Sequence, residues 1–221
     1  MLDCIEITTT EPCEYCIIWL HGLGARGHDF EPIVPELGLA EQPGVRFLFP
    51  HAPVRPITIN GGAAMRGWYD ITSLDFGNRQ QDTAGIRDSA AHINNLIDTQ
   101  IAQGIPARNI LLAGFSQGGA IALFTALTSN HQLGGIMALS TYLPLQDAVF
   151  NELTEHGKHL PLFMAHGKHD DVIHIQHAEQ SRDILSEHGI SVQWHQYSIT
   201  HSVSAEEIAD IATWLKNQLG M

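Results

Sequence analysis

The chain has 221 residues, of which 44% are hydrophobic, and this length is enough to bury one sizeable core. We therefore expect a single domain spanning residues 1–221. Eleven lysine and arginine residues against twenty-four aspartate and glutamate residues give a formal net charge of -13. Nucleic acids and anionic membrane surfaces both attract clustered cations, so this acidic balance argues against either as a partner.

The sequence contains neither a signal-peptide pattern nor an apolar run of about eighteen residues, which predicts a cytoplasmic protein with no integral membrane segment. Its three cysteines, Cys4, Cys13 and Cys16, are too few and too clustered for a disulfide framework, so we expect reduced thiols. Cys13 and Cys16 have the spacing of a redox motif, but they lead into a predicted strand and do not open a helix. A structural role is therefore favoured for both.

Short apolar runs alternate along the chain with longer stretches of helical period. This alternation predicts an α/β fold with a mostly parallel central sheet flanked by helices. The expected strands are Cys4 to Thr8, Tyr15 to Leu20, Arg46 to Phe49, Ile110 to Phe115, Gly135 to Leu139, Leu162 to His166, and Val192 to Tyr197.

Two amphipathic helices are clear from the spacing of apolar residues. One covers Thr83 to Gln103 and is stopped by Gly104 and Pro106. The last helix is introduced by Ser204-Ala205-Glu206-Glu207, in which we expect Ser204 and Glu207 to cap each other's backbone N–H groups. The stretch from Ala52 to Gln81 has no clear period, and connections of that length in a domain are usually functional.

The chemistry begins at Gly114-Phe115-Ser116-Gln117-Gly118, where a predicted strand turns sharply into residues of helical composition, Gly119 to Leu127. A serine on such a strand-to-helix turn is typical of a hydrolase nucleophile, and the flanking glycines keep strand and helix from colliding. The alternative is an ordinary glycine-rich turn with a capping serine, which leaves the partners described next unexplained.

A serine hydroxyl needs a base to remove its proton and an acid to orient that base, and in this fold the chain order is serine, acid, histidine. Asp170 and Asp171 follow the strand that ends at His166, and we favour Asp170 as the acid. His201 follows the last strand, so we expect it to be the base.

Other histidines lie in the same third of the chain, and a surface or core role is favoured for each of the following: His166, His169, His174, His177, His188 and His195. A metal site built from His169, Asp170, Asp171, His174 and His177 is a second hypothesis. It is disfavoured because no metalloprotease helix or paired-cysteine motif is present, and because it leaves the Ser116 turn without a purpose. A hydrolase-like fold used only for binding is a third hypothesis, which the presence of all three triad residue types weakens.

Attack on a carbonyl creates an oxyanion that preorganised donors must meet. Leu20-His21-Gly22-Leu23-Gly24 follows a predicted strand and is typical of the esterase loop that offers one backbone N–H. We therefore expect the backbone N–H groups of Leu23 and Gln117 to form the oxyanion hole. Because the donors are main-chain groups, their side chains carry little information; the alternative is a flexible loop.

Five motifs recur in order along the chain: Leu20-His21-Gly22-Leu23-Gly24, Arg66-Gly67-Trp68-Tyr69-Asp70, Gly114 to Gly119, Leu139-Ser140, and His166-Gly167-Lys168-His169-Asp170. Together they resemble the phospholipase/carboxylesterase family of α/β-hydrolases, which includes the acyl-protein thioesterases. The resemblance implies a hydrolase without a large cap domain or cofactor, cleaving esters and often thioesters of short or medium acyl chains. It also implies Ser116, Asp170 and His201 as the triad.

The same resemblance makes the 52 to 81 loop part of an acyl groove, with Trp68, Ile71 and Leu74 as candidate wall residues and core packing as the alternative for Trp68. It leaves acyl-protein thioesterase or lysophospholipase activity open as the main activity, with an acylated protein or a small-molecule or lipid ester as substrate, and it makes a homodimer plausible. One departure is Thr200, since the family often has glycine before the catalytic histidine.

Overall fold

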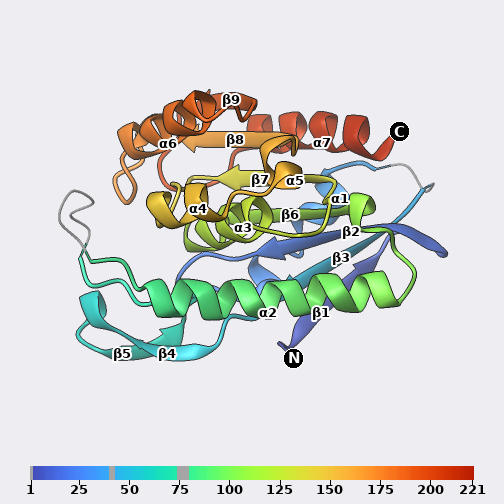
Figure 1. The fold of residues 1–221 in the computed structure, drawn as a ribbon. Helices are drawn as coiled ribbons and strands as arrows, with labels where there is room; N and C mark the ends of the chain where they lie inside the picture. Colours follow the sequence, from blue (N-terminus) through green and yellow to red (C-terminus); the bar gives the residue numbers. More distant parts are fainter. Residues whose placement is uncertain (1, 40–42, 74–79) are drawn as a thin grey trace.

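The computed structural model describes residues 2–39, 43–73 and 80–221, and its centre is a seven-stranded sheet. The strand order is β1-β3-β2-β6-β7-β8-β9, which Figure 1 shows from bottom to top. β1 runs antiparallel to β3, and the other neighbours are parallel. The strands are β1 (Cys4–Thr8), β2 (Cys13–Leu20), β3 (Gly44–Pro50), β6 (Ile110–Phe115), β7 (Gly135–Leu139), β8 (Leu162–Gly167) and β9 (Val192–Tyr197).

This sheet confirms the predicted α/β class, and each strand lies within a few residues of its predicted position. β2 and β3 are longer than expected because Cys13 and Gly44 already pair at their starts. The helices are α1 (Ile33–Glu36), α2 (Thr83–Ala102), α3 (Gln117–Leu127), α4 (Gln146–Glu152), α5 (Glu155–Lys158), α6 (Ile175–Glu187) and α7 (Ala205–Leu219).

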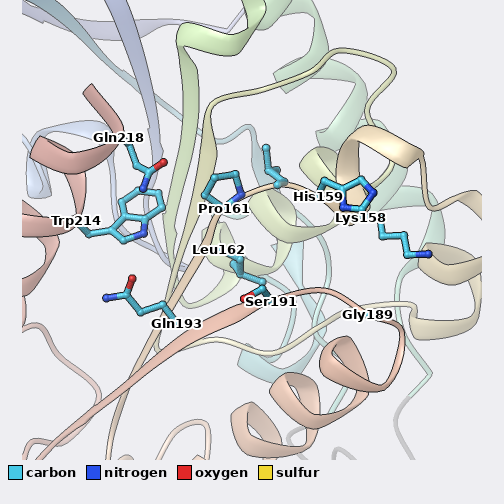
Figure 2. Close-up of a pocket in the computed structure, with 10 residues that line it drawn as sticks. Lys158, His159, Pro161, Leu162, Gly189, Ser191, Gln193, Trp214 and Gln218 are labelled. Atoms are coloured by element: carbon cyan, nitrogen blue, oxygen red, sulfur yellow. The ribbon is translucent and has the colours of Figure 1, made fainter. Parts of the chain in front are cut away.

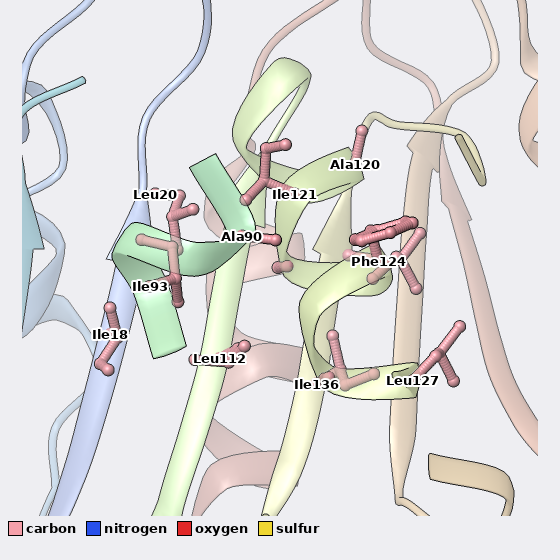
Figure 3. Close-up of a cluster of buried hydrophobic side chains, with 14 of the residues drawn as sticks. Ile18, Leu20, Ala90, Ile93, Leu112, Ala120, Ile121, Phe124, Leu127 and Ile136 are labelled. Atoms are coloured by element: carbon pink, nitrogen blue, oxygen red, sulfur yellow. The ribbon is translucent and has the colours of Figure 1, made fainter. Parts of the chain in front are cut away.

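Side chains alternate along each strand, so the sheet has two apolar faces. On β2, Ile18 and Leu20 join the core cluster under α2 and α3, whereas Ile17 and Trp19 join the cluster under α1 and α7. Figure 3 shows how α2 and α3 pack onto the first face around Leu112. Each fully buried aliphatic side chain contributes about 1.5–3 kcal/mol, so helices on both faces hold the sheet rigid below the strand ends.

The stretch from 52 to 81 contains secondary structure that the sequence pattern did not reveal. β4 (Val54–Ile57) and β5 (Ala63–Arg66) form a two-stranded antiparallel sheet at one side of the molecule, beside the start of α2 (Figure 1). A turn of 3-10 helix, Thr58–Asn60, connects them and ends at Gly61 with a positive φ of 66°. The hairpin brings the Trp68-Tyr69 segment back towards the sheet.

The predicted cap of the last helix is formed in part, and α2 has a cap that the sequence reasoning did not name. Asp82 caps α2 by accepting from the Gly85 N–H at 2.9 Å, and Ser204 caps α7 by accepting from the Glu207 N–H at 3.1 Å. The reciprocal bond from the Glu207 carboxylate, expected from the sequence, is not formed: neither of its oxygens has a partner among the described residues. Among the helices that the structure describes, none combines the length and apolarity needed to cross a membrane.

Candidate active site

Ser116 lies on the sharp turn between β6 and α3, at the carboxyl edge of the sheet. Its backbone has φ 54° and ψ -121°, a conformation that non-glycine residues rarely adopt. The Ser116 N–H donates to the Leu139 carbonyl at 2.9 Å, which ties the turn to β7. The strained turn holds the hydroxyl above the sheet edge.

The flanking glycines are steric requirements, as the sequence suggested. A Cβ atom at Gly114 would lie 2.3 Å from the Gly118 carbonyl oxygen, and one at Gly118 would lie 2.4 Å from the Leu20 carbonyl oxygen. Real Cβ atoms do not approach oxygen that closely, so β6, α3 and the end of β2 meet only because both positions lack a side chain.

The structure brings Ser116, His201 and Asp170 together. The Ser116 Oγ lies 2.9 Å from His201 Nε2, and His201 Nδ1 lies 2.7 Å from Asp170 Oδ2. A carboxylate only accepts hydrogen bonds, so His201 Nδ1 carries the proton and Nε2 is left to accept from the serine hydroxyl. This is the arrangement in which an imidazole can act as a general base.

Asp170 is 4% exposed, and donors other than His201 also bind its carboxylate. Its Oδ1 accepts from the N–H groups of Val172 at 2.9 Å and Ile173 at 2.8 Å. Burial alone would raise the pKa of Asp170, but hydrogen bonds from His166, His201 and the Ile173 N–H together hold that pKa well below its ordinary value. The carboxylate therefore stays ionised beside His201.

His166 is a core histidine, one of the two roles expected for it, and it supports the site through a contact that the sequence reasoning did not predict. It is fully buried, and its Nε2 lies 2.7 Å from the Ile173 carbonyl oxygen and 3.3 Å from Asp170 Oδ2. Both neighbours are acceptors, so Nε2 carries the proton and supports the Asp170 loop. Its place at the start of the His166-Gly167-Lys168-His169-Asp170 motif was the sequence signal that could have pointed to this role.

The loop that carries Asp170 packs closely against the loop that carries His201. The His169 N–H donates to the Ile199 carbonyl at 3.0 Å, and a Cβ atom at Gly167 would lie 2.4 Å from the Thr200 carbonyl oxygen. Thr200 is not among the described non-glycine residues with positive φ, so threonine is unstrained at the position where glycine is common in the family.

The remaining acidic and histidine candidates lie apart from Ser116. Asp171 is exposed, as is His169. His195 Nδ1 lies 3.2 Å from Asp210 Oδ2, and the His188 ring stacks on Phe150. Over the residues 2–39, 43–73 and 80–221, no group of three or more histidine, cysteine, aspartate or glutamate side chains has the arrangement of a metal site.

The Leu23 loop is fixed by the side chain of His21, which is fully buried. The ring accepts from the Ala52 N–H at 3.0 Å through Nε2 and therefore donates through Nδ1 to the Gly22 carbonyl at 2.7 Å. Burial lowers the pKa of His21 to about 4, so the ring stays neutral and keeps both bonds at neutral pH.

The Gln117 side chain makes two hydrogen bonds to the 66–70 segment that the sequence reasoning did not predict. Its Oε1 accepts from the Trp68 N–H at 2.7 Å, and its Nε2 donates to the Tyr69 carbonyl at 2.6 Å. The expectation that this side chain carries little information is therefore corrected: it anchors the 66–70 segment next to Ser116. The backbone N–H of Gln117, at the first turn of α3, needs no acceptor within the helix.

An apolar cavity of about 270 Å³ opens beside Ser116. Ile71, one of the three candidate groove residues, lines it together with Leu23, Tyr69 and Ile173. Trp68 does not line it, which corrects the groove expectation: this ring is fully buried, and its indole N–H donates to the His21 carbonyl at 2.8 Å. Leu74, the third expected wall residue, lies outside the described residues.

A second depression, shown in Figure 2, lies at the opposite edge of the sheet. It has a volume of about 320 Å³ and is formed around the start of β8 and β9, with Pro161, Gln193 and Trp214 in its wall. Ligands of open α/β sheets bind at the carboxyl ends of the strands, where Ser116 lies and this depression does not.

Comparison with known proteins agrees with this geometry. The family model described as Phospholipase/Carboxylesterase matches residues 3–219. Acyl-protein thioesterase 1 of Yarrowia lipolytica is 39% identical over 92% of this chain and 91% of its own length. Carboxylesterase SOBER1 of Arabidopsis thaliana is 33% identical over 92% of this chain and 90% of its own.

Solved structures give the same result. The crystal structure of Arabidopsis thaliana SOBER1 is similar with a TM-score of 0.88 at 31% identity, covering 93% of this chain and 99% of that one. Zea mays acyl-protein thioesterase 2 has a TM-score of 0.87 at 29% identity over the whole of both chains. The chain therefore belongs to the phospholipase/carboxylesterase family of α/β-hydrolases, and it is a hydrolase acting on esters or thioesters.

Proposed function

We propose that this protein is a carboxylesterase in which Ser116, His201 and Asp170 form the catalytic triad, with activity on carboxylic esters and on thioesters. The observation that carries the proposal is the continuous hydrogen-bond chain from Ser116 Oγ through His201 to Asp170, at the mouth of an apolar cavity. No alternative base lies within hydrogen-bond distance of Ser116 among the described residues.

In the acylation step, His201 Nε2 removes the Ser116 proton as Oγ attacks the carbonyl carbon. Asp170 holds the imidazole in the required tautomer and stabilises the imidazolium ion. The imidazolium then gives its proton to the departing oxygen or sulfur. In the second step, water activated by His201 attacks the acyl-enzyme and releases the carboxylic acid.

The backbone N–H groups of Leu23 and Gln117 form the oxyanion hole in this proposal. His21 holds the Leu23 loop through its two buried hydrogen bonds, and the first turn of α3 directs the Gln117 N–H towards the Ser116 side. A preorganised donor of this kind is worth about 10²- to 10³-fold in rate.

Short to medium acyl chains are the proposed acyl class, supported by the modest apolar cavity of about 270 Å³ beside Ser116. The main substrate is a small-molecule or lipid ester, and an acylated protein is the alternative that the relatives named acyl-protein thioesterases favour. Lysophospholipase activity is the further alternative. Chain-length profiles on matched oxyester and thioester series separate them.

We also propose that residues 1–221 act as one cytoplasmic domain. The sheet runs without interruption from β1 near the start of the chain to β9 near its end, and the family model matches residues 3–219. All three cysteines are unpaired, as expected of a reducing compartment. Sedimentation equilibrium tests the homodimer that the family resemblance makes plausible.

The triad is tested by Ser116→Ala, with the exposed Ser198→Ala as the matched control. Ser116→Ala should lower kcat on a p-nitrophenyl butyrate substrate by about 10⁴- to 10⁶-fold and abolish labelling by a fluorophosphonate probe. Ser198→Ala should retain both. Near-normal turnover in a folded Ser116→Ala protein would refute the proposal.

A further inference from the structure

Two cavities meet at Ser116. The first is the apolar cavity of about 270 Å³ described above, and the second, of about 490 Å³, also has Ser116 in its wall. Leu23, Ser116 and Val172 line both. The two cavities therefore share a wall at Leu23, Ser116 and Val172, and each has further lining residues that the other lacks.

The position of His201 decides which cavity holds which half of the substrate. His201 lines the larger cavity and does not line the smaller one. When the tetrahedral intermediate collapses, the imidazolium must give its proton to the departing oxygen or sulfur, so that atom must face the ring. The leaving group therefore belongs in the larger cavity and the acyl chain in the smaller one.

The larger cavity has an aromatic wall. Phe30 and Phe115 line it, with ring centroids 5.7 Å apart. Phe30 also stacks on the buried Trp19 ring at 5.6 Å, and Phe115 lies 4.7 Å from the His201 ring. The rings are held in place from the core outwards, so they offer a preformed apolar surface directly beside the proton donor.

The charges in this cavity are also informative. Asp29 is the acidic side chain in the lining, and the described lining contains no lysine or arginine. Asp29 Oδ2 accepts from the Arg26 backbone N–H at 2.7 Å, which fixes a carboxylate at the edge of the cavity. A phosphate next to the ester bond would meet like charge here and find no cation to pair with.

We infer that the cavity lined by Phe30, Phe115 and Val203 binds the leaving group, and that the enzyme favours esters and thioesters of apolar, especially aromatic, alcohols and thiols over those whose alcohol carries a phosphate. The inference rests on the proposed function. In acylation, the bond from Ser116 Oγ to the carbonyl carbon forms, the bond to the alcohol oxygen or thiol sulfur breaks, and the serine proton leaves on that atom through His201.

The test uses three butyryl esters with the same acyl group: 2-phenylethyl butyrate, ethyl butyrate and the butyryl ester of glycerol 3-phosphate. The wild-type enzyme should have its highest kcat/KM on the phenylethyl ester and its lowest on the phosphate ester. Phe30→Ala should lower the phenylethyl-to-ethyl ratio of kcat/KM by about tenfold, because the stacked ring that contacts the leaving group is lost.

Two further variants keep the inference falsifiable. Val203→Asp is the variant to use if Phe30→Ala does not fold. Val203 is in the loop after His201, and an aspartate there places a second carboxylate in the cavity, so the phenylethyl-to-ethyl ratio of kcat/KM should fall. Phe150→Ala is the matched control, because this ring packs on His188 away from Ser116, and it should leave the ratio unchanged. A folded Phe30→Ala or Val203→Asp protein with the wild-type ratio would overturn the inference, as would a phosphate ester that is cleaved as well as the phenylethyl ester.

The acyl-enzyme separates failure of this inference from failure of the triad. All three esters give the same butyryl-Ser116, so the alcohol site should affect acylation more than deacylation. Intact-mass detection of butyryl-Ser116 together with an unchanged ratio in Phe30→Ala refutes the leaving-group site alone. Near-wild-type turnover of these esters by a folded Ser116→Ala protein refutes the triad itself.

Discussion

Glu207 gives the structure a pH-dependent weakness that can be measured. The residue is at the start of α7, it is 0% exposed, and neither carboxylate oxygen has a hydrogen-bond partner among the described residues. Burial raises the pKa of Glu207 from 4.5 to about 7, and the nearby Asp210 carboxylate adds to the shift. Between pH 4.5 and about 7, Glu207 is therefore mostly protonated in the folded protein and mostly ionised in the unfolded chain.

The size of the effect follows from linkage. Because the folded-state pKa lies above the unfolded one, the contribution to stability is fully present below pH 4.5 and is lost as the pH rises through about 7. A difference of this size corresponds to about 3 kcal/mol. For a chain of this length, that is a fall in Tm of about 6–12 °C between pH 4 and pH 9 from this residue alone.

The assay is thermal unfolding followed by circular dichroism across that pH range for the wild type, Glu207→Gln and Glu206→Gln. Glu207→Gln should remove most of the alkaline loss, because glutamine does not ionise. Glu206→Gln is the matched control, since it makes the same charge change at the exposed neighbouring position and should follow the wild-type curve. Parallel pH curves for Glu207→Gln and the wild type would refute the reasoning.

Three further predictions concern the site. Asp170→Asn should lower kcat by about 10⁴-fold because the amide no longer holds the reactive tautomer of His201, whereas the exposed Asp171→Asn should change kcat less than about threefold; ester-hydrolysis kinetics on both variants measure this. Gly118→Ala should destabilise the fold by about 1–3 kcal/mol or more in urea unfolding, because its Cβ would lie 2.4 Å from the Leu20 carbonyl oxygen; unchanged stability would contradict that geometry. Ile71→Phe should shift the acyl-chain optimum to shorter p-nitrophenyl esters by filling the small cavity, and an unchanged chain-length profile would count against the acyl assignment.

The parallel strands and the turn at Ser116 were predictable because their signals are local. A buried parallel strand is a short apolar run, and the strand-to-helix turn requires small residues at Gly114 and Gly118 whatever surrounds it. The order of Ser116, Asp170 and His201 along the chain then limited the candidates, because each follows a strand at the same edge of the sheet.

The hairpin of β4 and β5 was missed for a physical reason. Val54 is 62% exposed, Ile57 is the one fully buried residue of the two strands, and each strand is only four residues long, so neither gives an apolar run long enough to recognise in the sequence. Trp68 and Tyr69 posed a different problem. Both are aromatic neighbours in one loop, and only the folded chain turns one ring into the core and the other towards the cavity.

The roles of buried polar side chains were the least accessible to sequence reasoning, since they depend on partners distant in the chain. Gln117 joins three segments: its side chain bonds Trp68 and Tyr69, and the Trp68 indole bonds the His21 carbonyl at 2.8 Å. His21 in turn holds the Leu23 loop. The backbone donors proposed for the oxyanion and the wall of the acyl cavity thus share one buried network. We therefore predict that changes in the Tyr69 segment which alter the proposed acyl fit also lower kcat, because the proposed oxyanion donors belong to the same network; kcat and chain-length profiles measured on the same variants test this coupling.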